Sequence, residues 1–413
     1  MTTTASDEKR QNATYEQQSI EMQPEQELIS PESDSVVYPP QDGGLKAWLF
    51  LFGACIVEIT AWGTPIAGAF TTSGAGLVIC LGIIYGLGAG LLFAPSMHFM
   101  GDWFVKRKSF AYGVICGAGA AAGAGLPPVY TLCLNKYGYK ATLIGWGICT
   151  FVITSFGLLF VHSRTPPEKA PKPSRSDFDF IRRPLFLVFL AATLAQALGY
   201  YAPSNYLPSI GADFGLTDQQ GALLNSLINL AQAIGQPVQG FLADTKASFY
   251  LPMLISTLGG GLESLLIWPF ASKLWSLVIF SLAYGATAGG FAVLRPRFAQ
   301  AVVGDNGGNK AASGASAPDG ESEQGPVPPQ DAAEEKESEV RDRNKSMFIF
   351  GIFTAVRGIA ILSSGFITVG LVHQESEDLD GYGHGYKWRS LIIYTGVTQI
   401  VSALGTVAKF IGR

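Results

Sequence analysis

The chain has 413 residues, of which 48% are hydrophobic and only 15% are charged, and its net charge is −4. Soluble domains carry about 25% charged residues, whereas the charges of this chain are confined to tails, loops and short junctions. The composition therefore excludes a soluble domain and a basic nucleic-acid-binding surface, and it predicts an all-α polytopic membrane protein.

The first 44 residues are rich in Gln, Glu, Ser, Thr and Pro. Such a composition cannot bury enough apolar surface to fold, so it predicts a disordered cytoplasmic tail over 1–44 without a cleavable signal peptide. Four apolar runs come after it, each near the ~20 residues that a membrane-spanning helix needs, and they predict an N-terminal helical bundle over 45–161. The runs are Leu45–Phe70, Ala75–Met97, Phe110–Cys133 and Thr142–Val161.

A polar cytoplasmic linker is predicted over 162–183. Six further runs predict a C-terminal helical bundle over 184–294 and 346–411, which is interrupted by a low-complexity cytoplasmic loop over 295–345. These runs are Pro184–Tyr206, Gly221–Leu242, Leu251–Ala271, Leu274–Leu294, Met347–Val372 and Leu391–Ile411. The sequence thus predicts about ten spans in two bundles.

Lys and Arg are distributed unequally between the two sides of these spans. If the spans alternate, the triplet Lys106–Lys108, the linker, the loop over 295–345 and the C-terminus all lie on the side that is rich in positive charge. Because cytoplasmic loops carry an excess of Lys and Arg, we expect both termini in the cytoplasm. The predicted location is the plasma membrane.

Three ionisable residues lie inside apolar runs, where charge is costly and usually functional. Glu58 could exchange a proton during transport, or could stay neutral and hydrogen-bonded to neighbouring helices. Arg357 could attract an anionic substrate or balance Glu58, or could form a structural ion pair. Glu263 could pack against a neighbouring helix or could line a pore. Arg295 and Arg297 are interpreted as topology anchors at a span end.

Two junctions on the positively charged side carry candidate gate residues. In "GDWFVKRKSFAYG", Asp102 precedes a basic triplet centred on Arg107, and in "GFLADTKASF", Gly240 and Asp244 end a span. A carboxylate at a helix end can hold a gate closed through charge and helix-end contacts. The glycine- and alanine-rich stretches 85–95 and 113–128 favour close helix packing, or a sliding surface between bundles.

Four stretches resemble the monocarboxylate-porter branch of the major facilitator superfamily, most closely its fungal members. The stretch "DGGLKAWLFLFGACIVEITAWGTP" resembles the first span of that branch, and "IIYGLGAGLLFAPSMHFMGDWFVKRKSFAYGVICGAGAAAGAGLPP" resembles the fourth and fifth. The stretch "LLNSLINLAQAIGQPVQGFLAD" resembles the eighth span and "FIFGIFTAVRGIAILSSGFI" the eleventh. The resemblance implies two six-helix halves, a major facilitator-like fold and transport by alternating access.

The resemblance also implies that two spans are absent. Family members have twelve spans, but here the first span continues through "WGTPIAGAFTTSGAG" into what resembles the fourth. The second and most of the third are missing, so the N-terminal bundle is predicted to be incomplete. The alternative to a transporter is therefore a truncated, non-transporting relative that acts as a sensor or is inactive.

The eighth span departs from the pattern of the animal members. They carry an Asp and, four residues later, an Arg before a Pro; at these positions this chain has Gln232 and Gln236. With Asn225 and Asn229, the two glutamines form a neutral amide face at helical spacing, which suits either substrate binding or interhelical hydrogen bonding. Aromatic walls for a small organic substrate are expected from Trp62, Tyr85, Tyr200 and Tyr201.

The leading hypothesis is a secondary transporter for a monocarboxylate-like organic acid or an exported secondary metabolite, with coupling to protons left open. The chain lacks a Gly-x-x-x-x-Gly-Lys-Ser/Thr motif, which disfavours an ATP-driven pump. Its four histidines are scattered and its five cysteines lie in or beside apolar runs, so no catalytic residue, metal or cofactor is predicted. The expected partners are a small-molecule substrate and the lipid bilayer, with no nucleic acid.

Overall fold

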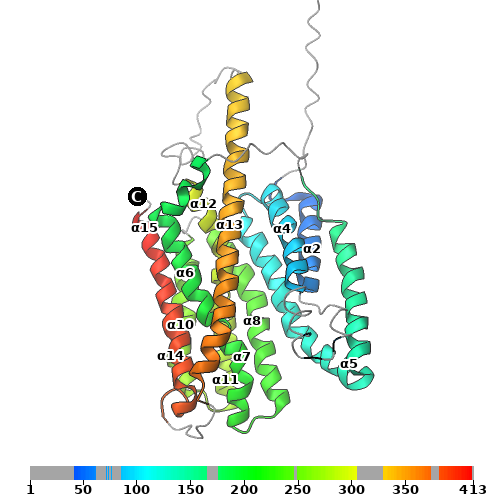
Figure 1. The fold of residues 1–413 in the computed structure, drawn as a ribbon, viewed down its shortest axis with the longest axis vertical. Helices are drawn as coiled ribbons and strands as arrows, with labels where there is room; N and C mark the ends of the chain where they lie inside the picture. Colours follow the sequence, from blue (N-terminus) through cyan, green and yellow to red (C-terminus); the bar gives the residue numbers. More distant parts are fainter. Residues whose placement is uncertain are drawn as a thin grey trace, which may run out of the picture. The chain divides into compact units, whose positions relative to one another are not determined.

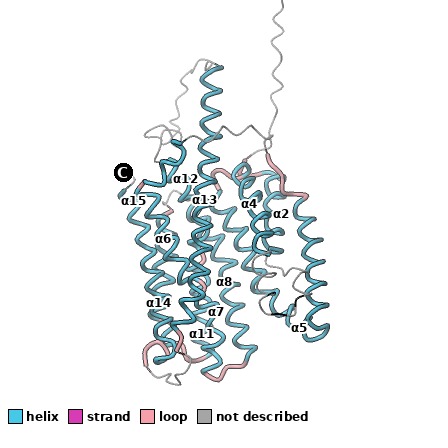
Figure 2. The backbone as a smooth tube through the Cα atoms, in the orientation of Figure 1, coloured by secondary structure: helices cyan, strands magenta, loops and turns pink. Residues whose placement is uncertain are grey.

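A computed structural model describes residues 41–61, 71, 73, 76, 85–164, 175–245, 249–304, 329–373 and 381–411. The chain divides into two units, Met1–Pro39 and Pro40–Arg413, and every described helix belongs to the second. Within the described residues every regular element is a helix (Figure 2). The predicted tail and the predicted join around Trp62 lie outside these residues.

Three helices make up the described N-terminal part: α2 (Gly44–Ala61), α4 (Tyr85–Trp103) and α5 (Lys108–Leu158) (Figure 1). Helix α5 has 51 residues and covers two predicted spans. The two are separated by a non-helical residue, Gly138, with φ 74° and ψ 174°. A positive φ costs glycine little because it has no Cβ, and the chain turns back there in Figure 1.

The C-terminal part is longer and its spans are built from shorter helices joined end to end. The α-helices are α6 (Pro184–Tyr200), α7 (Ala202–Asp213), α8 (Asp218–Asp244), α9 (Tyr250–Leu254), α10 (Gly260–Leu266), α11 (Leu274–Ala288), α12 (Gly290–Gly304), α13 (Pro329–Leu371), α14 (Gly385–Ser402) and α15 (Ala408–Ile411). Short 3-10 or π turns are η3 (Arg175–Arg182), η4 (Ile255–Gly259), η5 (Trp268–Phe270) and η7 (Ala403–Val407).

Local sequence signals set several helix starts. Pro184 occupies the first turn of α6, where its missing N–H costs nothing. Thr217 caps α8 in a reciprocal capping box: its hydroxyl accepts from the Gln220 amide at 3.3 Å, and the Gln220 side chain accepts from the Thr217 amide at 2.9 Å. These caps fix where the chain enters the membrane-length helices.

Six described helical stretches are long and apolar enough to cross a membrane, which confirms a polytopic all-α protein. They are Lys108–Leu158, Pro184–Asp213, Tyr250–Phe270, Leu274–Gly304, Glu337–Leu371 and Gly385–Val407. The predicted number of ten spans is not established by these six. Helix α8, which has 27 residues, is not among them because its amide side chains lower its hydropathy.

The predicted loop over 295–345 is wrong at both ends. Helix α12 continues to Gly304 and buries Phe298 and Val302 against the core, and α13 begins at Pro329. The residues over 331–345 are mostly Ala, Glu, Lys and Arg, which favour a helix even when they cannot form a core. Residues 305–328 lie outside the described part of the chain.

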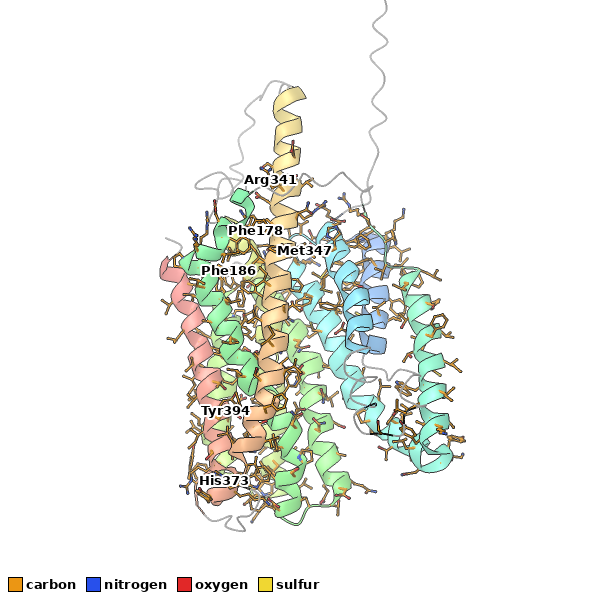
Figure 3. All side chains as sticks on the ribbon, in the orientation of Figure 1. Phe178, Phe186, Arg341, Met347, His373 and Tyr394 are labelled. Atoms are coloured by element: carbon orange, nitrogen blue, oxygen red, sulfur yellow. The ribbon has the colours of Figure 1, made fainter. Side chains whose placement is uncertain are left out.

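The two ends of the helices differ. We call the end that bears the start of α5, the end of α8 and Met347 the Lys106 end, and the opposite end, with α7, the start of α8 and His373, the Asn205 end (Figure 3). We call α2, α4 and α5 the N-terminal helix group and α6–α15 the C-terminal helix group. An apolar core at the Lys106 end joins the two groups and includes Phe50, Trp103, Tyr112, Phe298 and Phe353. A second core toward the Asn205 end belongs to the C-terminal helices and includes Leu207, Trp268, Phe280, Tyr284 and Trp388.

Glycine allows α5 to approach α8 closely. A Cβ atom at Gly113 would lie 2.6 Å from the Gln236 carbonyl oxygen, and one at Gly240 would overlap the Ser109 backbone. Real Cβ atoms do not come this close, so both positions require glycine. Residues of α5 and α8 that lie further along this contact form one wall of a cavity between the two helix groups.

Candidate functional site

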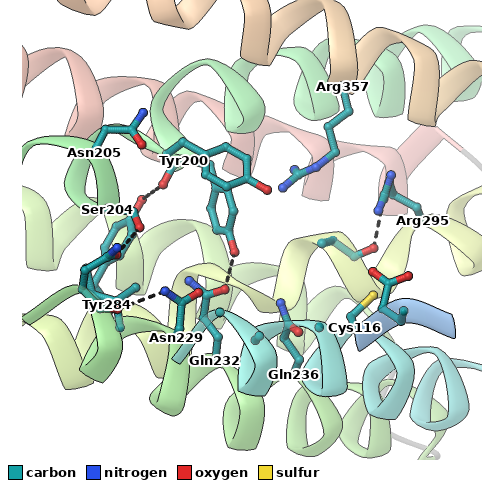
Figure 4. A pocket seen from close by; sticks show the side chains of 18 residues that line it. Cys116, Tyr200, Ser204, Asn205, Asn229, Gln232, Gln236, Tyr284, Arg295 and Arg357 are labelled. Atoms are coloured by element: carbon teal, nitrogen blue, oxygen red, sulfur yellow. Dashed lines mark hydrogen bonds between the residues drawn. The ribbon is translucent and has the colours of Figure 1, made fainter. Parts of the chain in front are cut away.

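A cavity of about 360 Å³ lies between the two helix groups (Figure 4). Its wall is contributed by α2, α5, α6, α7, α8, α11, α12 and α13. The lining side chains are Glu58, Cys116, Gly119, Ala120, Gly123, Tyr200, Tyr201, Ser204, Asn205, Asn225, Ile228, Asn229, Gln232, Gln236, Tyr284, Ala292, Arg295 and Arg357.

The structure brings five of the predicted substrate-binding residues to this one cavity: Glu58, Asn225, Gln232, Gln236 and Arg357. The other two predictions are not placed. Trp62 lies outside the described residues, and Tyr85 begins α4 but its side chain is likewise outside the described part. A role in binding stays a prediction for all seven.

Arg357 reaches the cavity from α13 and is only 7% exposed. Its Nη1 donates to the Gln196 Oε1 at 2.5 Å, and its guanidinium lies 4.9 Å from the centre of the Tyr200 ring. Both partners are neutral. A buried guanidinium held by an amide and an aromatic face retains its full charge, so it attracts an anion.

Arg295 is a second buried guanidinium on the cavity wall, also 7% exposed. It donates to the Tyr112 hydroxyl at 2.7 Å and to the Thr354 hydroxyl at 3.2 Å, and these partners are neutral too. The prediction of a simple topology anchor is therefore wrong. The predicted span ended at Leu294, but α12 continues to Gly304 and the Arg295 side chain is buried.

Glu58 is the one carboxylate among the described lining residues and comes from α2. Glu263 does not line the cavity; its carboxylate accepts from the Thr287 hydroxyl at 2.8 Å and joins α10 to α11. This contact fits the packing role that the sequence left open for Glu263. The cavity wall therefore carries two guanidinium groups and one carboxyl group.

The amide face of α8 forms the wall opposite the arginines (Figure 4). Tyr200 donates to Gln232 Oε1 at 2.9 Å, and Ser204 donates to Asn225 Oδ1 at 2.6 Å. Gln236 is 5% exposed, and its Oε1 has no hydrogen-bond partner within the described part of the chain. Sequence reasoning missed Ser204, because a serine in a membrane helix carries no specific signal.

Asp244, a predicted gate residue, joins α8 to α5 and α12 at the Lys106 end, and its role as a gate stays a prediction. Its carboxylate accepts from the backbone amides of Ser109 at 3.1 Å and Phe110 at 2.7 Å, in the first turn of α5. It also pairs with Arg297 at 2.6 Å. A carboxylate at a helix N-terminus is favourable because free N–H groups and the helix dipole point toward it. Gly240, one turn earlier, provides the close helix approach.

Asp102, another predicted gate residue, joins α4 to α13 at the same end. Its carboxylate pairs with Arg343 of α13 at 2.8 Å and accepts from the Ser163 hydroxyl at 3.2 Å. Arg107 contributes through its backbone instead of its charge, because its amide donates to Asp42 at 2.8 Å while its side chain is exposed. Asp42, which the sequence did not single out, thereby fixes the junction between α4 and α5.

The lining residues of the cavity are more deeply buried toward the Lys106 end than toward the Asn205 end. Ala292 and Arg295, at the first, are 6% and 7% exposed, whereas Asn205, at the other, is exposed and Asn225 is half-buried. Tyr112, which receives the Arg295 hydrogen bond, is fully buried beneath Phe350, with ring centres 5.8 Å apart.

Similarity to known proteins points to one family. The sequence profile described as Major Facilitator Superfamily matches residues 46–317. The chain is 24% identical over 221 residues to "MFS-type transporter 1" of Ophiocordyceps sp. (strain BCC 1869), covering 53% of this chain and 49% of that one. It is 25% identical over 270 residues to "Monocarboxylate transporter 12" of Xenopus laevis, covering 58% of each.

A third relative is "Monocarboxylate transporter 11" of Homo sapiens, 28% identical over 243 residues, covering 55% of this chain and 51% of that one. The chain thus spans about half the length of the curated relatives that it matches. Among solved structures, the nucleoside transporter NupG matches with a TM-score of 0.49 and 13% identity, over 88% of this chain and 83% of that one.

Proposed function

Because the chain belongs to the Major Facilitator Superfamily, whose profile matches residues 46–317, we propose that it moves a small organic anion across a membrane by alternating access. The observation that carries this proposal is the charge of the cavity. Two buried guanidinium groups, Arg295 and Arg357, face a single carboxyl group, Glu58, among the described lining residues.

The neutral partners of the two arginines support an anionic solute. A buried charge is costly unless it is compensated, and the side chains that accept hydrogen bonds from the two guanidinium groups, Gln196, Tyr112 and Thr354, are neutral. A solute that carries a carboxylate would supply the missing charge. The amide side chains of α8 and the rings of Tyr200, Tyr201 and Tyr284 suit the polar and apolar parts of its body.

The class of solute follows from this chemistry and from the relatives. We propose a monocarboxylate-like organic acid or an exported secondary metabolite, since relatives include proteins named as monocarboxylate transporters and an "Agnestins efflux protein AgnL12" of Paecilomyces divaricatus. Glu58 is the candidate for proton coupling. The proposed location is the plasma membrane, with the Lys106 end and both termini in the cytoplasm.

Alternating access requires two alternative closures around one site. The ion pairs Asp244–Arg297 and Asp102–Arg343 supply the closure at the Lys106 end, and the exposed cavity residues near Asn205 supply the access at the other. In the opposite state these pairs separate and the Asn205 end closes over the solute.

A flux assay in proteoliposomes tests this function. We expect uptake of short and aromatic carboxylates but not of the matched neutral amides, with and without a proton gradient. Arg357→Gln and Arg295→Gln should each lower uptake at least about 30-fold, because truncating one partner of a buried charge contact costs about 2–5 kcal/mol. Glu58→Gln should remove only the dependence on the proton gradient. Equal uptake of acid and amide would contradict an anion site.

A non-transporting relative is the second candidate, favoured by the predicted loss of the second and third spans. Such a protein would bind organic acids without moving them. It is distinguished by a carboxylate that raises the thermal stability of the purified protein, while no carboxylate crosses the vesicle membrane under any gradient.

A further inference from the structure

Lys108 is a buried lysine that has no partner among the described residues. It is the first residue of α5 and only 9% exposed. Its ammonium group makes no hydrogen bond or ion pair with any described residue. A lysine is almost never fully buried unless it is paired, so its place in the Lys106 end requires an explanation.

The void beside the Lys108 side chain is lined mostly by carbon. A Cβ atom at Gly101 of α4 would lie 3.6 Å from the Lys108 Nζ, so the side chain crosses from α5 to α4. It borders a void of about 10 Å³, room for at most one water, whose other lining residues are Met97, Met100, Pro296, Ser346, Met347 and Phe350. These residues come from α4, α12 and α13, so Lys108 lies where the two helix groups meet.

The nearby charges act on Lys108 in both directions: Arg297 and Arg343 disfavour its charged form and Asp102 favours it. Arg297 is paired with Asp244 and Arg343 with Asp102, so no free carboxylate among these groups compensates the ammonium. The N-terminus of α5 itself carries partial positive charge, which disfavours a cation in its first turn. Asp244, the carboxylate that complements this helix end, is occupied by two backbone amides and Arg297.

We propose that the charge of Lys108 destabilises the closed state of the Lys106 end and so opposes the two ion pairs that stabilise this state. When this end opens, α5 separates from α12 and α13 and the ammonium regains water. The two opposed contributions keep closed and open states close enough in free energy to interconvert. This inference rests on the proposed alternating access, but it concerns the equilibrium between the states and not the solute.

Cysteine labelling from each side of the membrane measures that equilibrium. Cys116 lines the cavity, and it is kept as the only thiol by replacing the other four of the five cysteines with alanine. Inside-out and right-side-out vesicles are treated with a membrane-impermeant maleimide, and the labelling rate of Cys116 is recorded from each side. A Cys116→Ala chain gives the background.

The decisive variant is Lys108→Met, which keeps the length of the side chain and removes its charge. Labelling of Cys116 from the Lys106 end should slow about tenfold or more, because a buried unpaired ion is costly, and labelling from the Asn205 end should not slow. Lys108→Arg keeps the charge and should retain the parent's labelling rate from the Lys106 end. Asp102→Asn should act in the opposite direction and speed labelling there.

Two results would overturn the inference. One is a Lys108→Met protein labelled from the Lys106 end as fast as the parent. The other is equal slowing by Lys108→Met and Lys108→Arg, which would indicate a packing effect. If Lys108→Met does not reach the membrane, Lys108→Gln is measured with the same criteria, and failure of both to fold would contradict a destabilising role. Absent flux with a normal labelling response would instead reject the proposed transport.

Discussion

Replacing Asp244 by asparagine should loosen the first turn of α5. The carboxylate accepts two backbone amides, from Ser109 at 3.1 Å and Phe110 at 2.7 Å, and pairs with Arg297 at 2.6 Å. A hydrogen bond to a charged group contributes about 1.5–3 kcal/mol. Asparagine offers one acceptor in place of two, and the Arg297 side chain, 25% exposed, is partly screened by solvent.

We therefore expect local opening of this turn to become easier by roughly 3 kcal/mol, which corresponds to about 150-fold faster exchange of its amides. Hydrogen–deuterium exchange of a peptide that covers Ser109 and Phe110 measures this directly. Asp213→Asn is the matched control: it breaks the Lys387–Asp213 pair, 2.8 Å long and also partly exposed, at the Asn205 end. That control should leave the peptide unchanged. Unchanged exchange in Asp244→Asn would refute the assigned closure.

Three single contacts give further predictions. Gly113→Ala should destabilise the folded protein by about 1–3 kcal/mol through overpacking against α8. Gly351 has open space around it, so Gly351→Ala should instead stabilise α13 by about 0.5–1 kcal/mol. Thermal unfolding of the two variants in detergent measures both effects. Tyr200→Phe loses its hydrogen bond to Gln232 but keeps the ring beneath the guanidinium, so KM should rise less than about tenfold in the flux assay. Burial lowers the pKa of His384 from 6.5 to about 4, so the unfolded chain binds the proton more readily than the folded one. The contribution of His384 to the free energy of unfolding is therefore full above pH ~6.5 and falls as the pH drops toward ~4. His384→Phe should reduce this dependence of stability on pH, measured as thermal unfolding between pH ~7 and ~4.

The cavity could be predicted in part because intramembrane charge is rare. Glu58 and Arg357 stand out in apolar runs, and the amides of α8 repeat at helical spacing, so sequence alone indicates one polar face on each of three helices. Arg295 could not be identified in this way. It follows the last apolar residue by one position, and only the packing of α12 shows whether that span ends at Leu294 or continues inward.

The ion-pair and hydrogen-bond partners that lie far apart in the sequence could not be predicted either. Asp102 and Asp244 were recognisable as carboxylates at helix ends, but Arg343 lay in a segment whose composition indicated a loop, and Arg297 was indistinguishable from a topology anchor. Helical propensity over 331–345 was the available signal for α13. The neutral partner of Arg357, Gln196, carried none, because a single glutamine in an apolar run commonly bonds to a neighbouring helix.

The length of α13 ties two distant places together. The helix has 43 residues and is therefore about 65 Å long. Arg343 and Arg357 are 14 positions apart along it, which separates them by about 21 Å and, at about 100° per residue, by only about 40° around the axis. A tilt of this rod about a point away from both residues displaces both guanidinium groups together. The proposed binding of a solute at Arg357 would then also affect the contact between Arg343 and Asp102.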